Sequence, residues 1–162
     1  MKDDEIRRQF PSAFPDGVPP KGARPEEIVV YRICTTGKVE SASFLPTYLE
    51  SVLPYTRDIS KAAPDCGHYS MSTYEKYNDA AKALRRFQKR HPPAILAKGA
   101  TSPECGWVLR DKEIPFIEEL KDCVQGKDMK RMKKSSHVHW WLYEGAEPHK
   151  FFQPFEEKEE SI

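Results

Sequence analysis

Residues 135–145, SSHVHWWLYEG, place histidine, tryptophan and glutamate side chains in one short stretch of the chain. Alternate residues of a β-strand face the same side, so the spacing predicts His137, His139 and Trp141 on one face and Trp140 on the other. Imidazoles that titrate near neutral pH, beside a flat indole, suit a ligand cleft. We therefore expect His137 and His139 to be catalytic and Trp141 to contact a ligand. The alternative is an aromatic patch that another part of the chain covers.

Cys66 and His68 form a second close pair of ligand-type side chains. Together with His137 and His139 they are numerous enough for a tetrahedral zinc ion. The two pairs lie on different predicted elements, however, and nothing in the spacing fixes how they approach each other. We therefore expect no metal cofactor, and histidines that hydrogen-bond locally.

Several motifs of nucleotide sites and nucleophiles are absent from the sequence. Neither G-x-G-x-x-G nor G-x-x-x-x-G-K-[ST] occurs, which excludes Rossmann and P-loop nucleotide sites and with them kinases and NTPases. G-x-S-x-G is also missing, so no serine nucleophile is indicated. The four cysteines form no C-x-x-C pair, and we expect reduced thiols.

The charge balance is close to neutral. Lys and Arg number 26 against 25 Asp and Glu, which gives no general affinity for nucleic acid or for an anionic membrane. No apolar run is long enough for a spanning helix, and the N-terminal residues lack the apolar core of a signal peptide. We therefore predict a cytoplasmic protein without a membrane partner. The basic run Lys127–Lys134 is the first candidate surface for a protein or a nucleic acid, with nucleic acid not favoured.

Short alternating or β-branched stretches predict a sheet that positions these residues. Strands are expected at 27–34, 67–72, 94–99, 105–110 and 137–144, and helices at 43–52, 74–90 and 113–124. The third and fourth strands are close enough along the chain to form a hairpin. The sequence therefore predicts a single α+β domain with a mixed or mainly antiparallel sheet of about five strands and two to four helices.

The helix at 74–90 has the clearest signals. Ser72 and Glu75 match a capping box, and apolar residues recur at spacings of three and four. Four cations, Arg85, Arg86, Lys89 and Arg90, fall in its last turns. We interpret them as a solvated helix end that complements the helix dipole.

Proline and charge runs predict the boundaries of the domain. We predict that residues 1–26 form a Pro-rich arm that lies outside the sheet core or along an edge and contributes little to stability. The α+β domain is expected over residues 27–155, and residues 156–162 are expected to form a frayed acidic tail. Residues 125–136 are polar and basic without periodicity, which predicts a loop.

Polar residues at the predicted strand ends follow a recognisable order. Arg32 follows the apolar run IVVY, the stretch Tyr69-Ser70-Met71-Ser72 leads into a helix, and Glu144 ends the last strand. This order resembles the arginine, serine and glutamate layout of ADP-ribosyltransferase-like proteins.

The resemblance implies an NAD-handling enzyme, or a degenerate relative that binds a nucleotide or phosphate ligand. In such a protein Arg32 would hold the NAD phosphates or ribose, and Glu144 would support an oxocarbenium-like transition state. The serine motif, Tyr69, Ser70 and Ser72, would brace the nicotinamide ribose. NAD is therefore the expected cofactor.

Each of these residues also has a structural interpretation. Ser72 suits a helix N-cap, Arg32 an ion pair at a strand end, and Glu144 a turn. Leu142 stands where the family has the first acid of an acid-x-acid pair, which puts transfer to arginine acceptors in doubt.

Two classes of function stay open. One is the NAD-handling enzyme or its relative with a small nucleotide-like ligand. The other is a non-catalytic small cytosolic protein of bacterial or phage kind that binds or inhibits a protein partner. The enzyme requires Arg32, Ser70 and either His137 or Glu144 around one concave pocket, whereas a binding module would spread its polar groups over a flat face.

Overall fold

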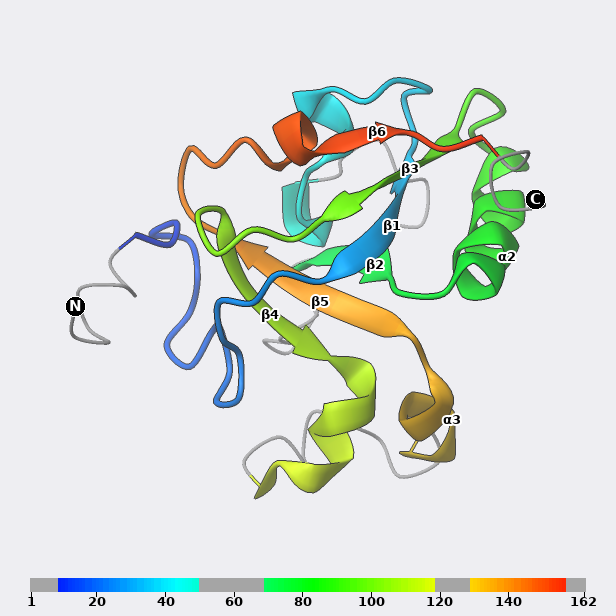
Figure 1. Cartoon of the computed structure of the whole chain (residues 1–162). Coiled ribbons are helices and arrows are strands. Elements are labelled where there is room, and N and C mark those ends of the chain that lie inside the picture. Colours follow the sequence, from blue (N-terminus) through cyan, green and yellow to red (C-terminus); the bar gives the residue numbers. More distant parts are fainter. Residues whose placement is uncertain (1–8, 50–68, 119–128, 157–162) are drawn as a thin grey trace.

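The computed structural model describes residues 9–49, 69–118 and 129–156 (Figure 1). The interpretations of Cys66, His68, Cys123 and Lys127, and of the frayed tail beyond residue 156, lie outside these ranges. One antiparallel sheet with the strand order β4-β5-β2-β1-β3-β6 forms the centre of the described part. The α+β architecture predicted from the sequence is confirmed, with one strand more than the five expected.

The strands and helices have the following bounds. The strands are β1 (Val29–Cys34), β2 (Met71–Tyr74), β3 (Ile95–Ala100), β4 (Gly106–Arg110), β5 (His137–Leu142) and β6 (Phe152–Pro154). The α-helices are α2 (Tyr77–Gln88) and α3 (Met129–Lys134). The short 3-10 helices are η1 (Ser41–Ser43), η2 (Thr47–Leu49), η4 (Asp111–Phe116) and η7 (Pro148–Phe151).

The pairing register decides which side chains share a face of the sheet. Tyr31 on β1 is opposite Tyr74 on β2, and Tyr74 is opposite His137 on β5. Directly opposed residues project to the same side, and neighbours along a strand project to opposite sides. We call the side that carries Tyr31, Tyr74 and His137 the helix face, because α2 packs on it through Ala80.

The opposite side, which we call the core face, carries the residues adjacent to these. Val30, Met71, Val138 and Trp140 are fully buried there in one apolar cluster. Side chains that alternate with this cluster along β5 must therefore lie on the helix face, as predicted for His137 and its neighbours.

The N-terminal arm packs on the sheet, contrary to its expected minor role in stability. Phe10 and Val18 are buried with Trp107 and Trp141 on the helix face, and the Phe10 and Trp107 rings are 5.2 Å apart. Arg24 also bridges Val108 on the outer side of β4, so that part of the arm does follow a sheet edge. Apolar residues between the prolines allow an extended arm to cover a sheet face.

The predicted start of the long helix is wrong. Helix α2 begins at Tyr77 with Lys76 as its N-cap residue, and no side chain caps it. Ser72 lies within β2 opposite His139, and the carboxylate of Glu75 accepts a hydrogen bond from Arg110. Ser72 is therefore used in strand pairing and Glu75 in an ion pair, and neither caps the helix.

Other boundaries also differ from the expectations. The described part of the predicted helix at 43–52 instead forms 3-10 turns on either side of Pro46. Of the predicted helix at 113–124 the structure describes residues 113–118, and there the 3-10 helix Asp111–Phe116, which contains Pro115, takes its place. Residues 129–134 of the predicted loop form α3. The β3–β4 hairpin is wrong, because β3 lies between β1 and β6 while β4 pairs with β5. Among the described residues, no helix is both long and apolar enough to cross a membrane.

Candidate functional site

Asp111, His137 and His139 form a compact polar cluster on the helix face. His137 Nδ1 lies 3.1 Å from Asp111 Oδ2, and His139 Nε2 lies 2.6 Å from Asp111 Oδ1. The two imidazole rings meet edge to face with their centroids 4.5 Å apart. Each side chain is 15–16% exposed, so the cluster is mostly enclosed and open on one side.

The pairing of β4 with β5 brings Asp111 to the histidines. Leu109 is opposite His139 and Arg110 is opposite Val138, so the next residue along, Asp111, arrives beside His137. Asp111 shares the helix face with Leu109 because the two residues are two positions apart along the chain. Asp111 was not among the residues predicted from the sequence, because nothing in the local pattern reveals which strand β4 pairs with.

Ser70 and Trp141 hold the ring of His139 from two sides. Ser70 Oγ lies 2.8 Å from His139 Nδ1, and the Trp141 ring stacks on the imidazole at 5.5 Å. Ser70 is fully buried, which excludes it as a nucleophile for a soluble substrate. Its hydroxyl instead positions the imidazole, because a hydrogen bond at Nδ1 leaves Nε2 directed toward Asp111.

The charge state of the cluster follows from burial and from the mutual contacts. Burial would raise the pKa of Asp111, but the two adjacent imidazoles more than offset this effect and hold the pKa well below its usual range. Burial lowers the pKa of His137, and the neighbouring His139 acts in the same direction. A carboxylate therefore faces an imidazole that is neutral at pH 7.

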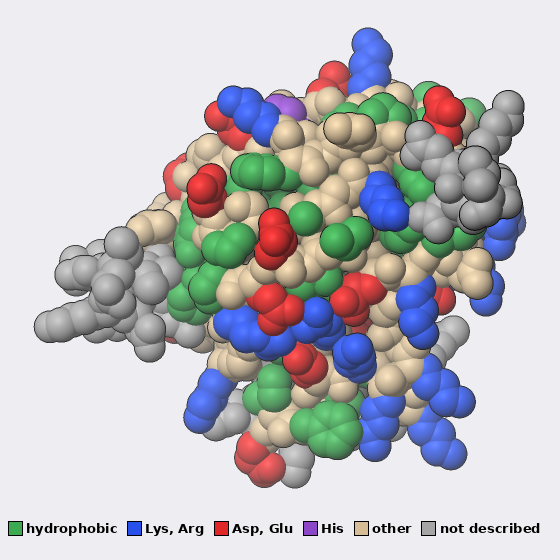
Figure 2. Space-filling view, in the orientation of Figure 1, with side chains coloured by type: hydrophobic (Ala, Val, Ile, Leu, Met, Phe, Trp, Pro, Cys, Tyr) green, Lys and Arg blue, Asp and Glu red, His purple; other side chains and the backbone are tan. Residues whose placement is uncertain are grey.

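A basic depression lies beside the cluster, and Asp111 lines both. It has a volume of about 980 Å³ and is lined by cations from two helices, namely Lys82, Arg85 and Arg86 of α2, Lys89 at the C-cap of α2, and Lys134 at the end of α3. Figure 2 shows Lys and Arg side chains gathered over the region of α3. We call this surface the basic depression. Lys134 belongs to the run that the sequence analysis proposed as a partner surface.

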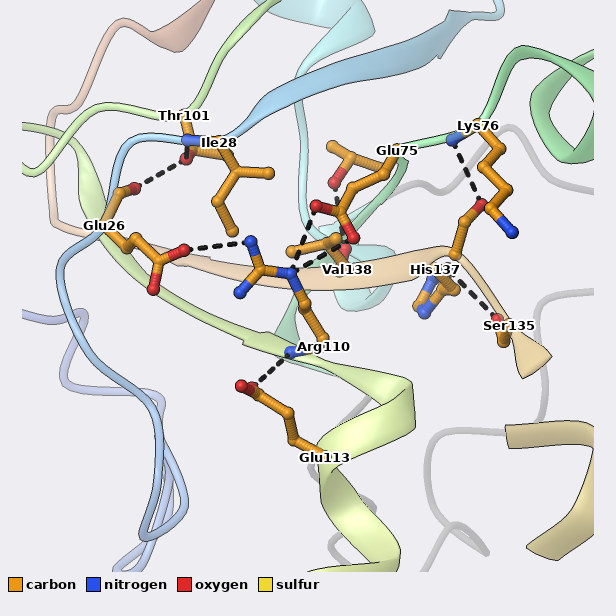
Figure 3. A network of polar contacts seen from close by, with 12 residues as sticks. Glu26, Ile28, Glu75, Lys76, Thr101, Arg110, Glu113, Ser135, His137 and Val138 are labelled. Atoms are coloured by element: carbon orange, nitrogen blue, oxygen red, sulfur yellow. Dashed lines mark hydrogen bonds and ion pairs between the residues drawn. The ribbon is translucent and has the colours of Figure 1, made fainter. Parts of the chain in front are cut away.

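A separate ionic network lies along the outer part of β4. Arg110 pairs with Glu75 at 3.1 Å and with Glu26 at 3.0 Å, and the carboxylate of Glu113 accepts a hydrogen bond from the Arg110 backbone N–H (Figure 3). Arg110 and His137 both project from neighbouring strands, but register places them on opposite faces, because Val138 is opposite Arg110. The network joins the arm, β2 and η4, and it fixes the backbone just before Asp111.

Arg32 does not join the histidine cluster. It lies on the core face, 5% exposed, and donates hydrogen bonds to the backbone carbonyls of Ser43, Leu45 and Ser72. The sheet itself therefore separates Arg32 from His137. These hydrogen bonds make Arg32 a brace that joins β1 to β2 and to the segment that follows β1.

The remaining predicted site residues do not all lie near the histidine cluster. Ser70 and Ser72 lie near His139, through a hydrogen bond and through strand pairing respectively. Tyr69 packs against Phe14 of the arm. Glu144 is exposed in the turn after β5, five positions along the chain from His139 and beyond the end of the strand at Leu142.

The structure thus unites His137, His139, Trp141 and Ser70, and leaves out Arg32 and Glu144. Comparison of the chain with protein-family models, with curated proteins and with solved structures finds no match. The chemistry of the cluster and of the basic depression is therefore what indicates a function.

Proposed function

We propose that the protein binds a small phosphate-bearing ligand in the basic depression, with Asp111 and the histidines at its inner end. The observation that carries the proposal is the convergence of five cations on one concave surface. Phosphate oxygens are recognised by Arg and Lys side chains through charge-assisted hydrogen bonds.

The spacing on α2 concentrates this charge. Lys82, Arg85, Arg86 and Lys89 recur at intervals of three and four residues, so they form one stripe of the helix. The opposite stripe, with Ala80 and other apolar residues, packs on the sheet. The helix is therefore fixed by its apolar side, and its basic side is available to a ligand.

The depression has a net positive charge. Its acids are Asp79 and Asp111, and both have neighbours: Ser136 donates a hydrogen bond of 2.6 Å to Asp79, and Asp111 faces the histidines. Among the described residues, none of the five cations has a carboxylate within ion-pair distance. An anionic ligand would supply the missing negative charge.

Nucleotides are the first ligand class to test, NAD included. Tyr74 lies at the depression and contacts the edge of the His137 ring, which offers flat apolar surface next to the cations. A base or a nicotinamide could use such a surface while the phosphates meet the α2 stripe. ADP-ribosyl transfer would need Arg32 and Glu144 at the same place, so we propose ligand binding without assigning a transfer reaction.

A thermal-shift screen tests the proposal. Inorganic phosphate, pyrophosphate, ADP and NAD would each be added to the full chain, and affinities measured by calorimetry. A ligand at 100 times its dissociation constant adds about 2.7 kcal/mol of stability, which is a clear shift of the melting temperature. The double variant Arg85→Gln/Arg86→Gln should lose this shift.

The control variant removes the same charge elsewhere. Lys38 and Lys150 are exposed and lie outside the depression. Lys38→Gln/Lys150→Gln should therefore bind the ligand as the unchanged protein does. Equal weakening by both double variants would reduce the effect to net charge, and the absence of any ligand-induced shift would reject the proposed function.

A further inference from the structure

We propose that Asp111, His137 and His139 form a binding site for one divalent transition-metal ion. The three side chains each offer one ligand atom, and these atoms all lie within 4.8 Å of one another. Ligands about 2.0–2.2 Å from a tetrahedral ion lie roughly 3.4 Å apart, and the 3.1 Å between His137 Nδ1 and Asp111 Oδ2 is close to this separation. The inference does not depend on the proposed phosphate ligand.

Unsatisfied buried atoms distinguish this cluster from an ordinary hydrogen-bonded one. His137 Nδ1 and Asp111 Oδ1 are buried, and within the described part of the chain neither has a hydrogen-bond partner. His137 Nδ1 lies close to Asp111 Oδ2, and Asp111 Oδ1 lies close to His139 Nε2, but neither pair has the alignment that a hydrogen bond requires. Buried polar atoms without partners are rare, and convergence on a shared point is how metal ligands are arranged.

An unpartnered histidine nitrogen alone would not support a site. His91 and His149 each have such a nitrogen too. Among the described residues, however, Asp111, His137 and His139 are the group with three metal-ligating atoms within reach of one ion. The difference is that strand pairing brings a carboxylate to a pair of imidazoles two residues apart.

The surroundings of His139 match those of a metal ligand. Histidines that bind metals usually use their second ring nitrogen for a hydrogen bond that fixes the tautomer and the ring orientation. Ser70 Oγ is 2.8 Å from His139 Nδ1 and is fully buried, and Trp141 stacks on the ring. His139 Nε2 is thereby held toward Asp111.

The donor set indicates the class of ion. Two imidazoles and one carboxylate suit Zn²⁺ or Fe²⁺, whereas Mg²⁺ and Ca²⁺ prefer oxygen ligands alone. Three protein ligands leave further coordination positions open. Asp111 also lines the basic depression, so these positions would be accessible from it.

Calorimetric titration of Zn²⁺ into chelator-treated full-length protein tests the site. The thiols that react under native conditions would be alkylated first, so that accessible thiolates do not contribute; Cys34 and Cys105 are buried in the core and stay unmodified. We expect one Zn²⁺ per chain and no comparable binding of Mg²⁺. Asp111→Asn and His139→Gln should each raise the dissociation constant by more than about 100-fold, and Ser70→Ala, which removes a positioning group, by about 10-fold.

Matched variants and spectroscopy separate this site from adventitious binding. His91→Gln and His149→Gln remove other histidines and should leave Zn²⁺ affinity unchanged. Co²⁺ should give the visible absorption of a nitrogen and oxygen site, also in the Arg85→Gln/Arg86→Gln protein. Melting curves establish that each variant is folded. Loss of metal binding on alkylation, or full affinity in both folded Asp111→Asn and His139→Gln, would overturn the proposal.

Discussion

On one face of β5, Val138, Trp140 and Leu142 are enclosed in the main apolar cluster, while on the other His137 and His139 contact a carboxylate and a serine. Adjacent residues of one strand thus have opposite environments. The two-residue strand period determines the faces, but segments distant in the sequence determine what covers each face. Apolar segments cover Trp140, whereas η4 places Asp111 next to the histidines.

The helix face itself changes character along β5. Trp141 lies under the N-terminal arm and is buried, two residues from the polar pair. The stacked contact between the His139 and Trp141 rings marks this boundary. Trp141 thus corresponds to the alternative of a covered aromatic patch, because the arm packs over it. The basic depression lies on the other side of the histidines, toward α2 and α3.

Truncation of Trp140 should produce the largest difference between the two faces. The side chain is fully buried in the core, so Trp140→Ala should lower the free energy of unfolding by about 3–5 kcal/mol. His137→Ala, on the other face, should cost about 1 kcal/mol or less. Chemical denaturation of both variants measures this difference.

Trp140→Phe is the matched control for that experiment. The indole Nε1 of Trp140 is buried and has no hydrogen-bond partner among the described residues, so Phe removes an unsatisfied donor while it retains most of the ring. A small loss in Trp140→Phe combined with a large one in Trp140→Ala would assign the effect to the cavity. An equal loss in His137→Ala would mean that the faces differ less than their contacts indicate.

Replacement of Arg32 should give the next largest effect, and it separates a structural role from ligand binding. Arg32→Leu leaves carbonyl oxygens of Ser43 and Ser72 without their donors, and buried unsatisfied groups cost about 1–3 kcal/mol each. We expect a lower melting temperature and unchanged affinity for phosphate or NAD in the folded variant. Reduced affinity at unchanged stability would restore Arg32 to the ligand site.

The sequence was informative where a signal is local and uninformative where it depends on pairing. Four predicted strands, at 27–34, 94–99, 105–110 and 137–144, correspond to β1, β3, β4 and β5, because short β-branched or alternating runs bounded by turns are local signals. The capping box at Ser72 was misleading, since strand pairing outweighed a helix preference worth about 1 kcal/mol.

The candidate site was predictable in part for the same reason. The shared face of His137 and His139 follows from the strand period, whereas Ser70 and Ser72 were placed near a site only by the family resemblance. Asp111 could not be found this way, because its approach depends on the register of β4 against β5. The basic stripe of α2 was visible in the sequence, but only the structure shows that Lys134 and Asp111 adjoin it.

Replacement of Glu144 should have the smallest effect. It tests directly whether Glu144 lies outside the functional site. Glu144 is exposed in a turn, and its backbone N–H donates a hydrogen bond to the carbonyl of Gln9, which a side-chain change retains. Glu144→Gln should therefore change stability by no more than about 0.5 kcal/mol. Zn²⁺ and phosphate affinities should also match those of the unchanged protein, because Glu144 lies in the turn beyond β5 and belongs neither to the histidine cluster nor to the lining of the basic depression. If Glu144→Gln abolished a measured activity or weakened NAD binding while the melting temperature stayed constant, the functional residues would extend along β5 to its C-terminal end, and the arginine, serine and glutamate layout would regain its catalytic meaning.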